Sequence, residues 1–201
     1  MNLLAVDTAQ GYLSVYLSYN GKEYASFCGT AGMKHSTLLL PAVDHLLVSA
    51  GATLSEMDAF GVVVGAGSFT GIRIGVATVK AFALSQNKPV IPVTSFDVIA
   101  YNKTEGKRLA VINAKHGHYY VCGYDGASVD IPPCYLPEEE VIAIGKEREL
   151  LSYEEIPSLS TTVVSPNRGL AIAVNALSKM GVSPESVQPL YVRKSQAEEG
   201  R

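Results

Sequence analysis

Glycine, serine and threonine gather in residues 65–75, and their spacing is the first candidate for chemistry in this 201-residue chain. A glycine-rich turn between a strand and a helix holds phosphate in many nucleotide-binding proteins. A dinucleotide fingerprint requires glycine where Thr70 stands, however, and a P-loop requires Gly-Lys-Ser/Thr at its end, which this stretch lacks. A nucleophile elbow at Ser68 requires glycines in place of Ala66 and Thr70. We therefore favour a structural turn over a phosphate site.

Asp7 and the histidines are the remaining candidates for catalysis or metal binding. Asp7 follows the first predicted strand, where a kinase-like site uses an acid to hold magnesium, but one strand-end acid does not define such a site. His35 and His45 are ten residues apart, and His116 and His118 have no carboxylate pattern beside them. We therefore expect ordinary surface histidines, no metal and no cofactor. We also find no Ser, His and carboxylate set with motif support, so we expect no catalytic residues.

Composition narrows the functional classes. With 47% hydrophobic residues the chain can bury a substantial core, and its net charge of −3 argues against a free-standing nucleic-acid binder. Asp7 comes too early for a signal peptide, and no apolar run is long enough to span a membrane, so we expect a cytoplasmic protein. Cys28, Cys122 and Cys134 lack metal-type spacing and are predicted to be reduced, mostly buried thiols.

Alternating and periodic apolar residues predict the elements that position these groups. Residues 3–6, 13–18 and 23–28 are predicted strands, and Asn20-Gly21 joins the second and third as a hairpin. A helix over 36–50 that ends at Gly51, a strand over 59–64, a helix from about 72 to 84 and a strand over 90–93 follow. This order matches one ribonuclease-H-like half of the actin-like superfold.

The second half repeats the theme in a shorter and looser form. The linker-like composition of residues 102–107 places a boundary between lobes at 1–103 and 104–201, with the extreme C-terminus packing back on the first lobe. We predict strands over 109–114, 119–124 and 129–131, the last ended by Pro132-Pro133. A helix over 138–144, a strand over 161–164 and a helix over 170–180 complete the chain.

Four segments resemble the TsaB (YeaZ) family, the non-catalytic partner in the bacterial complex that makes threonylcarbamoyladenosine in tRNA next to the anticodon. They are residues 4–9, 35–41, 67–75 and, less specifically, 189–193, so the resemblance extends over most of the N-terminal half and a patch at the end. The family usually has proline where Ala66 stands and an Asp-Ala-Arg-like start where residues 113–115 stand. A family role of the 113–115 loop therefore does not carry over.

The resemblance implies an α/β, actin-like (ASKHA, ribonuclease-H-like) two-lobed fold with a reduced second lobe. It implies a scaffold that binds a catalytic TsaD-like subunit, with a TsaE-like ATPase in the full complex and tRNA bound only through that complex. The chain is expected to be able to form a homodimer when its partner is absent. The catalytic relative holds a metal with a His-x-x-x-His pair, which this chain lacks. An actin-like nucleotide-binding enzyme and a protease remain the alternatives.

Both long helices of the first half have a second face besides the one that packs on the sheet. We expect a partner, or a second copy of the chain, to dock on this face, where glycines permit close approach and Phe82 serves as an anchor. The alternative is that the face packs on the protein's own sheet or second lobe. The eight residues of the expected interface are Leu38, Ala42, His45, Ser49, Gly71, Gly75, Thr78 and Phe82.

Overall fold

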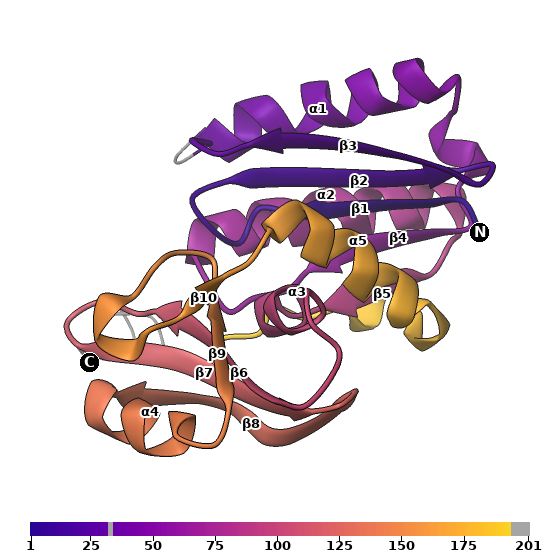
Figure 1. Cartoon of the computed structure of the whole chain (residues 1–201). Helices are drawn as coiled ribbons and strands as arrows, with labels where there is room; N and C mark the ends of the chain where they lie inside the picture. The colour runs from indigo at the N-terminus through magenta and orange to yellow at the C-terminus, as the bar shows by residue number, and fades with distance from the viewer. Residues whose placement is uncertain (32–33, 194–201) are drawn as a thin grey trace.

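A five-stranded sheet carries the first lobe of the computed structural model, which describes residues 1–31 and 34–193 (Figure 1). Its order is β3-β2-β1-β4-β5. Three antiparallel strands open it, and β4 and β5 run parallel to β1. The strands are β1 (Leu3–Asp7), β2 (Leu13–Tyr19), β3 (Lys22–Cys28), β4 (Ala59–Val63) and β5 (Val90–Val93). Positive φ angles of 50° at Asn20 and 75° at Gly21 confirm the predicted hairpin between β2 and β3.

Helices cover both faces of this sheet. On one face α1 (His35–Ala50) packs on β2 and β3, while α2 (Phe69–Gln86) packs on β4, β1 and β5. Val62 contacts α2, whereas its neighbour Gly61 approaches Val174 of α5 (Pro166–Ala176) on the opposite face. Central strands covered on both faces read as continuous apolar runs, and every residue of β1 and β4 is buried.

Helix α1 ends as predicted but tolerates a proline inside. Gly51 adopts the left-handed conformation at the C-cap, with φ of 64°. Pro41 cannot donate the helical hydrogen bond to the Thr37 carbonyl. Both residues are exposed, so water can satisfy that carbonyl, and the helix continues from His35 to Ala50.

A second sheet repeats the strand order with fewer helices. Read from β8, the order is β8-β7-β6-β9-β10, again three antiparallel strands followed by two parallel ones. The strands are β6 (Lys107–Asn113), β7 (His118–Asp125), β8 (Ser128–Pro137), β9 (Glu149–Ser152) and β10 (Thr162–Val163). Helix α4 (Glu138–Gly145) connects β8 to β9, but only a 3₁₀ turn, Pro157–Leu159, lies between β9 and β10. This two-lobed α/β arrangement with a reduced second lobe confirms the expected fold class.

Several predicted boundaries were wrong for physical reasons. Pro132-Pro133 does not end the third strand of the second lobe, because β8 is an edge strand and its pairing with β7 shifts register there, so missing N–H donors are tolerated. Helix α5 begins at Pro166 rather than at 170, because Ser165 is its N-cap and proline suits the first helical position. Helix α3 (Ser95–Ala100) and strand β9 were not predicted; both are short.

The end of the described chain returns to the first lobe. Helix α5 packs on β2, β1 and β5, Val182 forms a backbone bridge with Val90, and the Leu190 N–H donates to the Val64 carbonyl at 2.7 Å. The proposed division at residues 103 and 104 therefore assigns α5 to a lobe whose sheet it does not cover. We retain that division only as a proposal about where the chain passes from the first lobe to the second.

The three cysteines lie in the described part of the chain. Cys122 is buried, Cys28 and Cys134 are half-buried, and all three are free thiols. Among residues 1–31 and 34–193, no helix has the length and apolar character needed to cross a membrane.

Candidate functional site

The glycine-rich stretch packs against the turn that follows β1. The Ser68 N–H donates to the Ala9 carbonyl at 2.7 Å, and the Thr8 hydroxyl donates to the Gly71 carbonyl at 2.7 Å. A Cβ atom at Gly67 would lie 2.1 Å from the Ala9 carbonyl oxygen. The glycines thus serve the close approach of α2 to β1, which supports the structural interpretation of this stretch over a phosphate site.

Asp7 is fully buried at the end of β1 and is held by its own turn. Its two carboxylate oxygens accept hydrogen bonds from the Ala9 N–H at 2.9 Å and the Tyr12 hydroxyl at 2.7 Å. Burial raises the pKa of Asp7 to about 6, although both hydrogen bonds and the nearby His35 act in the opposite direction. The carboxylate that would hold magnesium in a nucleotide enzyme is here engaged by the Tyr12 hydroxyl.

A cleft of about 450 Å³ between the lobes opens beside this turn. Gln10 and Tyr12 line it from the first lobe, and Asn113, Lys115 and Tyr153 from the second. The rings of Tyr12 and Tyr153 meet edge to face at 5.4 Å, and the Tyr153 hydroxyl donates to the Ser95 carbonyl at 2.9 Å. The 113–115 loop, which departs from the family pattern, therefore lines the interlobe cleft together with the two tyrosines.

One histidine prediction was wrong. His35 is buried, and its Nε2 lies 2.8 Å from the Tyr12 carbonyl oxygen, so it braces the turn after Asp7 rather than lying on the surface. His45 and His116 are exposed, and His118 is half-buried. Within the ranges that the structure describes, no three His, Cys, Asp or Glu side chains gather closely enough to hold a metal ion.

The interface prediction is wrong for two of the eight residues, because they face the protein's own sheet. Gly71 and Gly75 are buried, and Cβ atoms there would lie 2.0 Å from the Thr8 carbonyl oxygen and 2.4 Å from the Thr8 hydroxyl oxygen. Their small size serves the contact between α2 and β1, not a partner helix. A large residue at 75 would disturb folding, so it does not test docking.

The other six residues lie on the flanks and outer surfaces of α1 and α2, which contact each other. Leu38, Ala42, Thr78 and Phe82 are half-buried, while His45 and Ser49 are exposed. The Phe82 ring lies 6.0 Å from that of Phe60 and packs on the core, so part of it is already covered. The role of these six as an interface stays a prediction.

Five apolar residues on the outer surface of these helices were not singled out as an interface. We define the outer helix face as Leu40, Val48, Ala77, Ala81 and Leu84, all of them exposed. Val48 is 73% exposed, Leu40 55% and Leu84 52%. Their signal in the sequence is helical spacing: Ala77 and Ala81 are four residues apart and lie on the opposite side of α2 from the buried Ile72, Val76 and Val79.

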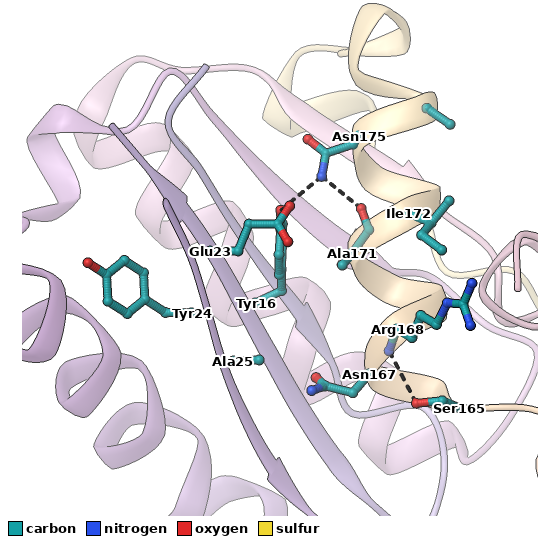
Figure 2. A pocket seen from close by; sticks show the side chains of 11 residues that line it. Tyr16, Glu23, Tyr24, Ala25, Ser165, Asn167, Arg168, Ala171, Ile172 and Asn175 are labelled. Atoms are coloured by element: carbon teal, nitrogen blue, oxygen red, sulfur yellow. Dashed lines mark hydrogen bonds between the residues drawn. The ribbon is translucent and has the colours of Figure 1, made fainter. Parts of the chain in front are cut away.

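A cavity lies on the face of the first sheet opposite α1 and α2, between β2, β3 and α5 (Figure 2). It measures about 800 Å³ and is lined in part by Tyr16, Glu23, Arg168 and Asn175. The Tyr16 hydroxyl donates to Glu23 at 2.8 Å and accepts from the Asn175 amide at 2.9 Å. No sequence motif predicted this groove, because its lining comes from segments about 150 residues apart.

Comparison with known proteins places the chain in a family. The family model described as "TsaD: tRNA N6-adenosine threonylcarbamoyltransferase" matches residues 29–161. The "tRNA threonylcarbamoyladenosine biosynthesis protein TsaB" of Escherichia coli is 34% identical over 128 residues, which are 62% of this chain and 55% of that protein. The protein of the same name from Bacillus subtilis is 30% identical over 122 residues, 60% of this chain and 53% of that protein. The chain spans about half the length of these relatives.

Two further comparisons cover more of the chain. An uncharacterized protein of Mycobacterium tuberculosis is 30% identical over 168 residues, 81% of this chain and 77% of that protein. The structure of YeaZ from Pseudomonas aeruginosa aligns with a TM-score of 0.81 at 25% identity, covering 94% of this chain and 99% of that one. Since the family model covers well over half of the chain and YeaZ shares its two-lobed fold, the chain belongs to the TsaB (YeaZ) family, within the group that the TsaD model describes.

Proposed function

We propose that the chain acts in the biosynthesis of threonylcarbamoyladenosine in tRNA as a non-catalytic subunit that binds a TsaD-like catalytic subunit. Its relatives are named for this pathway. On this proposal a TsaE-like ATPase joins the full complex, tRNA is bound through the complex, and the work takes place in the cytoplasm. A homodimer uses the same surface when the partner is absent, because homologous partners offer equivalent helices.

The outer helix face carries this proposal. Large exposed apolar patches often mark interaction sites, and Leu40, Val48 and Leu84, together with Ala77 and Ala81, are exposed apolar residues of two helices that contact each other. Specific interfaces bury on the order of 1,200–2,000 Å² in total, which two helices and their flanking loops can supply. The half-buried flank with Phe82 lies beside this face and extends it.

A charge on the outer helix face tests the proposal without disturbing the fold. Ala81→Arg and Val48→Arg should each weaken capture of the TsaD-like subunit at least tenfold, because docking would bury an unpaired guanidinium. The matched control is Val129→Arg, which places the same charge at an exposed valine of β8. Co-purification followed by mass measurement gives the result, and equal capture by all three variants would refute the docking surface.

The two alternatives, a nucleotide-binding enzyme and a protease, both require an active site in this chain. A solved structure of similar fold carries the description "similarity to peptidase YEAZ" in its name, at 24% identity. In this chain the Ser68 hydroxyl accepts the Gly71 N–H at 3.3 Å as the N-cap of α2, and Asp7 is engaged by Tyr12. We expect no threonylcarbamoyl product and no ATP turnover from the purified chain with magnesium. Turnover in calorimetry would favour the nucleotide-enzyme alternative.

A further inference from the structure

Strand β3 forms an edge of the first sheet that no other described segment covers. Its seven residues, Lys22–Cys28, pair with β2 without a shift in register, and none of them is proline. Proteins protect sheet edges with short strands, prolines, bulges or covering segments, because free backbone groups accept strands of other chains. Each of the other sheet edges is protected in this way: β8 contains prolines and shifts in register, β10 has two residues, and β5 is bridged by Val182.

Alternate residues of β3 direct their backbone groups away from β2. The two-residue turn between β2 and β3 makes Lys22 the first hydrogen-bonded residue of β3, and every second residue after it bonds to β2. The N–H and C=O groups of Glu23, Ala25 and Phe27 therefore point to the outer edge. Among residues 1–31 and 34–193, no backbone hydrogen bond from a loop or turn engages these groups. They are available to a further strand.

The side chains of the same three residues lie on the face of the sheet that carries α5. Ser14, which pairs with Phe27, donates to Asn167 of α5 at 2.7 Å. Glu23, Ala25 and Phe27 are exposed, and Phe27 is 49% exposed. Glu23 and Ala25 line the groove of about 800 Å³ beside α5 (Figure 2). A large apolar side chain thus stands next to an open groove on the same edge.

The edge is symmetric about Ala25, the central residue of β3. A two-fold axis at Ala25 would pair the full length of the strand with β3 of a second copy in antiparallel register. Ala25 would then lie opposite Ala25, and Glu23 opposite Phe27, and these are the residues whose backbone groups point outward. Each of these pairs would exchange both of its hydrogen bonds, and no like charges would lie opposite each other. The edge is therefore self-complementary.

The same axis brings Phe27 of one copy to the groove of the other. Side chains of directly opposed residues lie on the same face, about 5 Å apart, so Phe27 of the second copy would lie beside Glu23 on the α5 side. Ala25, Ala171 and the Tyr16 ring line the groove there, and the Tyr16 hydroxyl already binds the Glu23 carboxylate at 2.8 Å. Each exposed ring would thus be covered in the groove of the other copy.

We propose that two copies of the chain join through β3 in antiparallel register about Ala25, which makes one continuous sheet of the two first lobes. The inference goes beyond the proposed function and does not depend on it. Helices α1 and α2 lie on the opposite face of the sheet from α5, so the outer helix face stays open to a TsaD-like subunit. The β3 contact is therefore distinct from the homodimer through the outer helix face, which would compete with that subunit.

Sedimentation of the Val48→Arg chain tests the β3 contact by itself, because this substitution is chosen to disrupt the helix-face dimer. We expect a concentration-dependent dimer of Val48→Arg and a monomer when Ala25→Pro is added. The Ala25 N–H does not bond to β2, so proline there removes a donor to the second copy and spares the β2–β3 ladder. Urea unfolding of both variants checks the fold. A monomeric Val48→Arg chain at millimolar concentration, or equal dimerisation of both variants, would overturn the proposal.

Two substitutions of Phe27 test the register in the same Val48→Arg background. Phe27→Glu places a carboxylate opposite Glu23 of the second copy, whereas Phe27→Lys removes the same ring but places an ammonium group there. Because like charges directly opposite each other destabilise a strand pair, Phe27→Glu should weaken dimerisation about tenfold more than Phe27→Lys does. Equal weakening by both would mean that residue 27 does not face Glu23, and the proposed register would be wrong.

Cross-linking locates the axis. The Cα atoms of a hydrogen-bonded antiparallel pair are about 5.5 Å apart, within the range that a disulfide bridges, so Ala25→Cys should give a covalent dimer on mild oxidation. Ala127→Cys, at an exposed position of the second lobe, is the matched control and should not exceed the background of the native cysteines. Equal cross-linking of the two variants would contradict the axis at Ala25.

Capture of a TsaD-like subunit separates this proposal from the proposed function. Ala25→Pro should capture that subunit as well as the wild type does, while Val48→Arg should lose capture and keep the β3 dimer. If Ala25→Pro abolishes capture, β3 contacts the catalytic subunit rather than a second copy, and the present proposal is wrong. If neither variant affects capture but Ala25→Pro abolishes the dimer, the β3 contact stands and the outer helix face fails as the docking surface.

Discussion

The two lobes share one strand order but differ in the helices that cover it. In the first lobe two long helices, α1 and α2, cover one face, and their outer surfaces remain exposed. In the second lobe α4 connects β8 to β9, as α1 connects β3 to β4 in the first. A 3₁₀ turn lies between β9 and β10, where α2 lies between β4 and β5 in the first lobe. The paired helices on which we propose that a partner docks therefore belong to the first lobe, and the second lobe lacks the equivalent pair among its described residues.

The equivalent turns after β1 and β6 differ in charge. The Asp7 carboxylate accepts the Ala9 N–H at 2.9 Å, and the Asn113 amide oxygen accepts the Lys115 N–H at 2.9 Å. Both side chains therefore brace a turn at the interlobe cleft through the same local hydrogen bond. Only the first is a titratable group, and only the first is fully buried. The comparison indicates that the turn geometry requires an acceptor rather than a charge.

The largest effect is expected where α2 meets β1, a contact without a counterpart helix in the second lobe. Gly71→Ala would place a Cβ atom 2.0 Å from the Thr8 carbonyl oxygen and force the helix away from the strand. We expect a loss of about 3 kcal/mol in the free energy of unfolding, measured by urea denaturation. Gly11→Ala is the control, because its Cβ would meet nothing within 4 Å. A loss below about 1 kcal/mol for Gly71→Ala would show that α2 is not tightly seated.

Removing the charge at Asp7 should make the first turn behave like the second. The folded pKa of about 6 lies above the ordinary value of 3.8, so the folded state binds the extra proton between these values. This contribution to stability is present below about pH 4 and is lost as the pH rises through 6. The free energy of unfolding of Asp7→Asn, relative to that of the wild type, should therefore rise by about 3 kcal/mol as the pH increases from 4 to 7.5.

Urea unfolding of both proteins across this pH range measures the difference. The amide introduced by Asp7→Asn can keep both hydrogen bonds, accepting the Ala9 N–H and donating to the Tyr12 hydroxyl. Asn113→Asp is the reciprocal variant: its side chain is half-buried, so a much smaller pH effect is expected. A constant difference between Asp7→Asn and wild type at all pH values would mean that Asp7 titrates normally.

Sequence patterns predicted the first lobe better than the second. Its strands are long alternating or continuous apolar runs, and Asn20-Gly21 and Gly51 mark their turns and caps, so local signals and burial agree. Strand β9 was not predicted because its four residues are too few for a periodic signal, whereas the two-residue β10 lies within the strand predicted over 161–164. The predicted start of helix α5 lies too far along the chain because Gly169 interrupts the apolar pattern. Glycine is needed there, since a Cβ atom would lie 1.9 Å from the Val98 carbonyl oxygen.

The candidate site was predicted in part for a related reason. Helical periodicity separates one side of α2 from another, but it does not say which side contacts the sheet most closely. Gly71 and Gly75 therefore looked available to a partner, whereas they approach Thr8 of the protein itself. Contacts such as the stacked rings of Phe69 and Tyr191 escaped prediction because the two residues are far apart in the sequence and only the fold brings them together.

The smallest effect concerns the contact between the lobes. The Tyr124 hydroxyl of β7 donates to Asp97 of α3 at 2.8 Å, and Tyr124 is 2% exposed. Tyr124→Phe removes this bond, while the other oxygen of Asp97 still accepts from the Thr94 N–H and hydroxyl at 2.7 Å. Since Asp97 is half-buried and water can reach it, we expect a loss of only about 1 kcal/mol in the free energy of unfolding.

Tyr19→Phe is the control within the first lobe for this interlobe bond. The Tyr19 hydroxyl donates to the Glu56 carboxylate at 2.7 Å at the surface, where water can replace it, so its removal should cost less than the removal of the Tyr124 hydroxyl. Thermal unfolding of Tyr124→Phe should remain a single transition at a slightly lower midpoint, because the apolar contacts around Phe96 and Ile99 still join α3 to the second sheet. Two separate transitions in Tyr124→Phe, absent from Tyr19→Phe, would mean that this one hydrogen bond, rather than the surrounding apolar packing, makes the lobes unfold together.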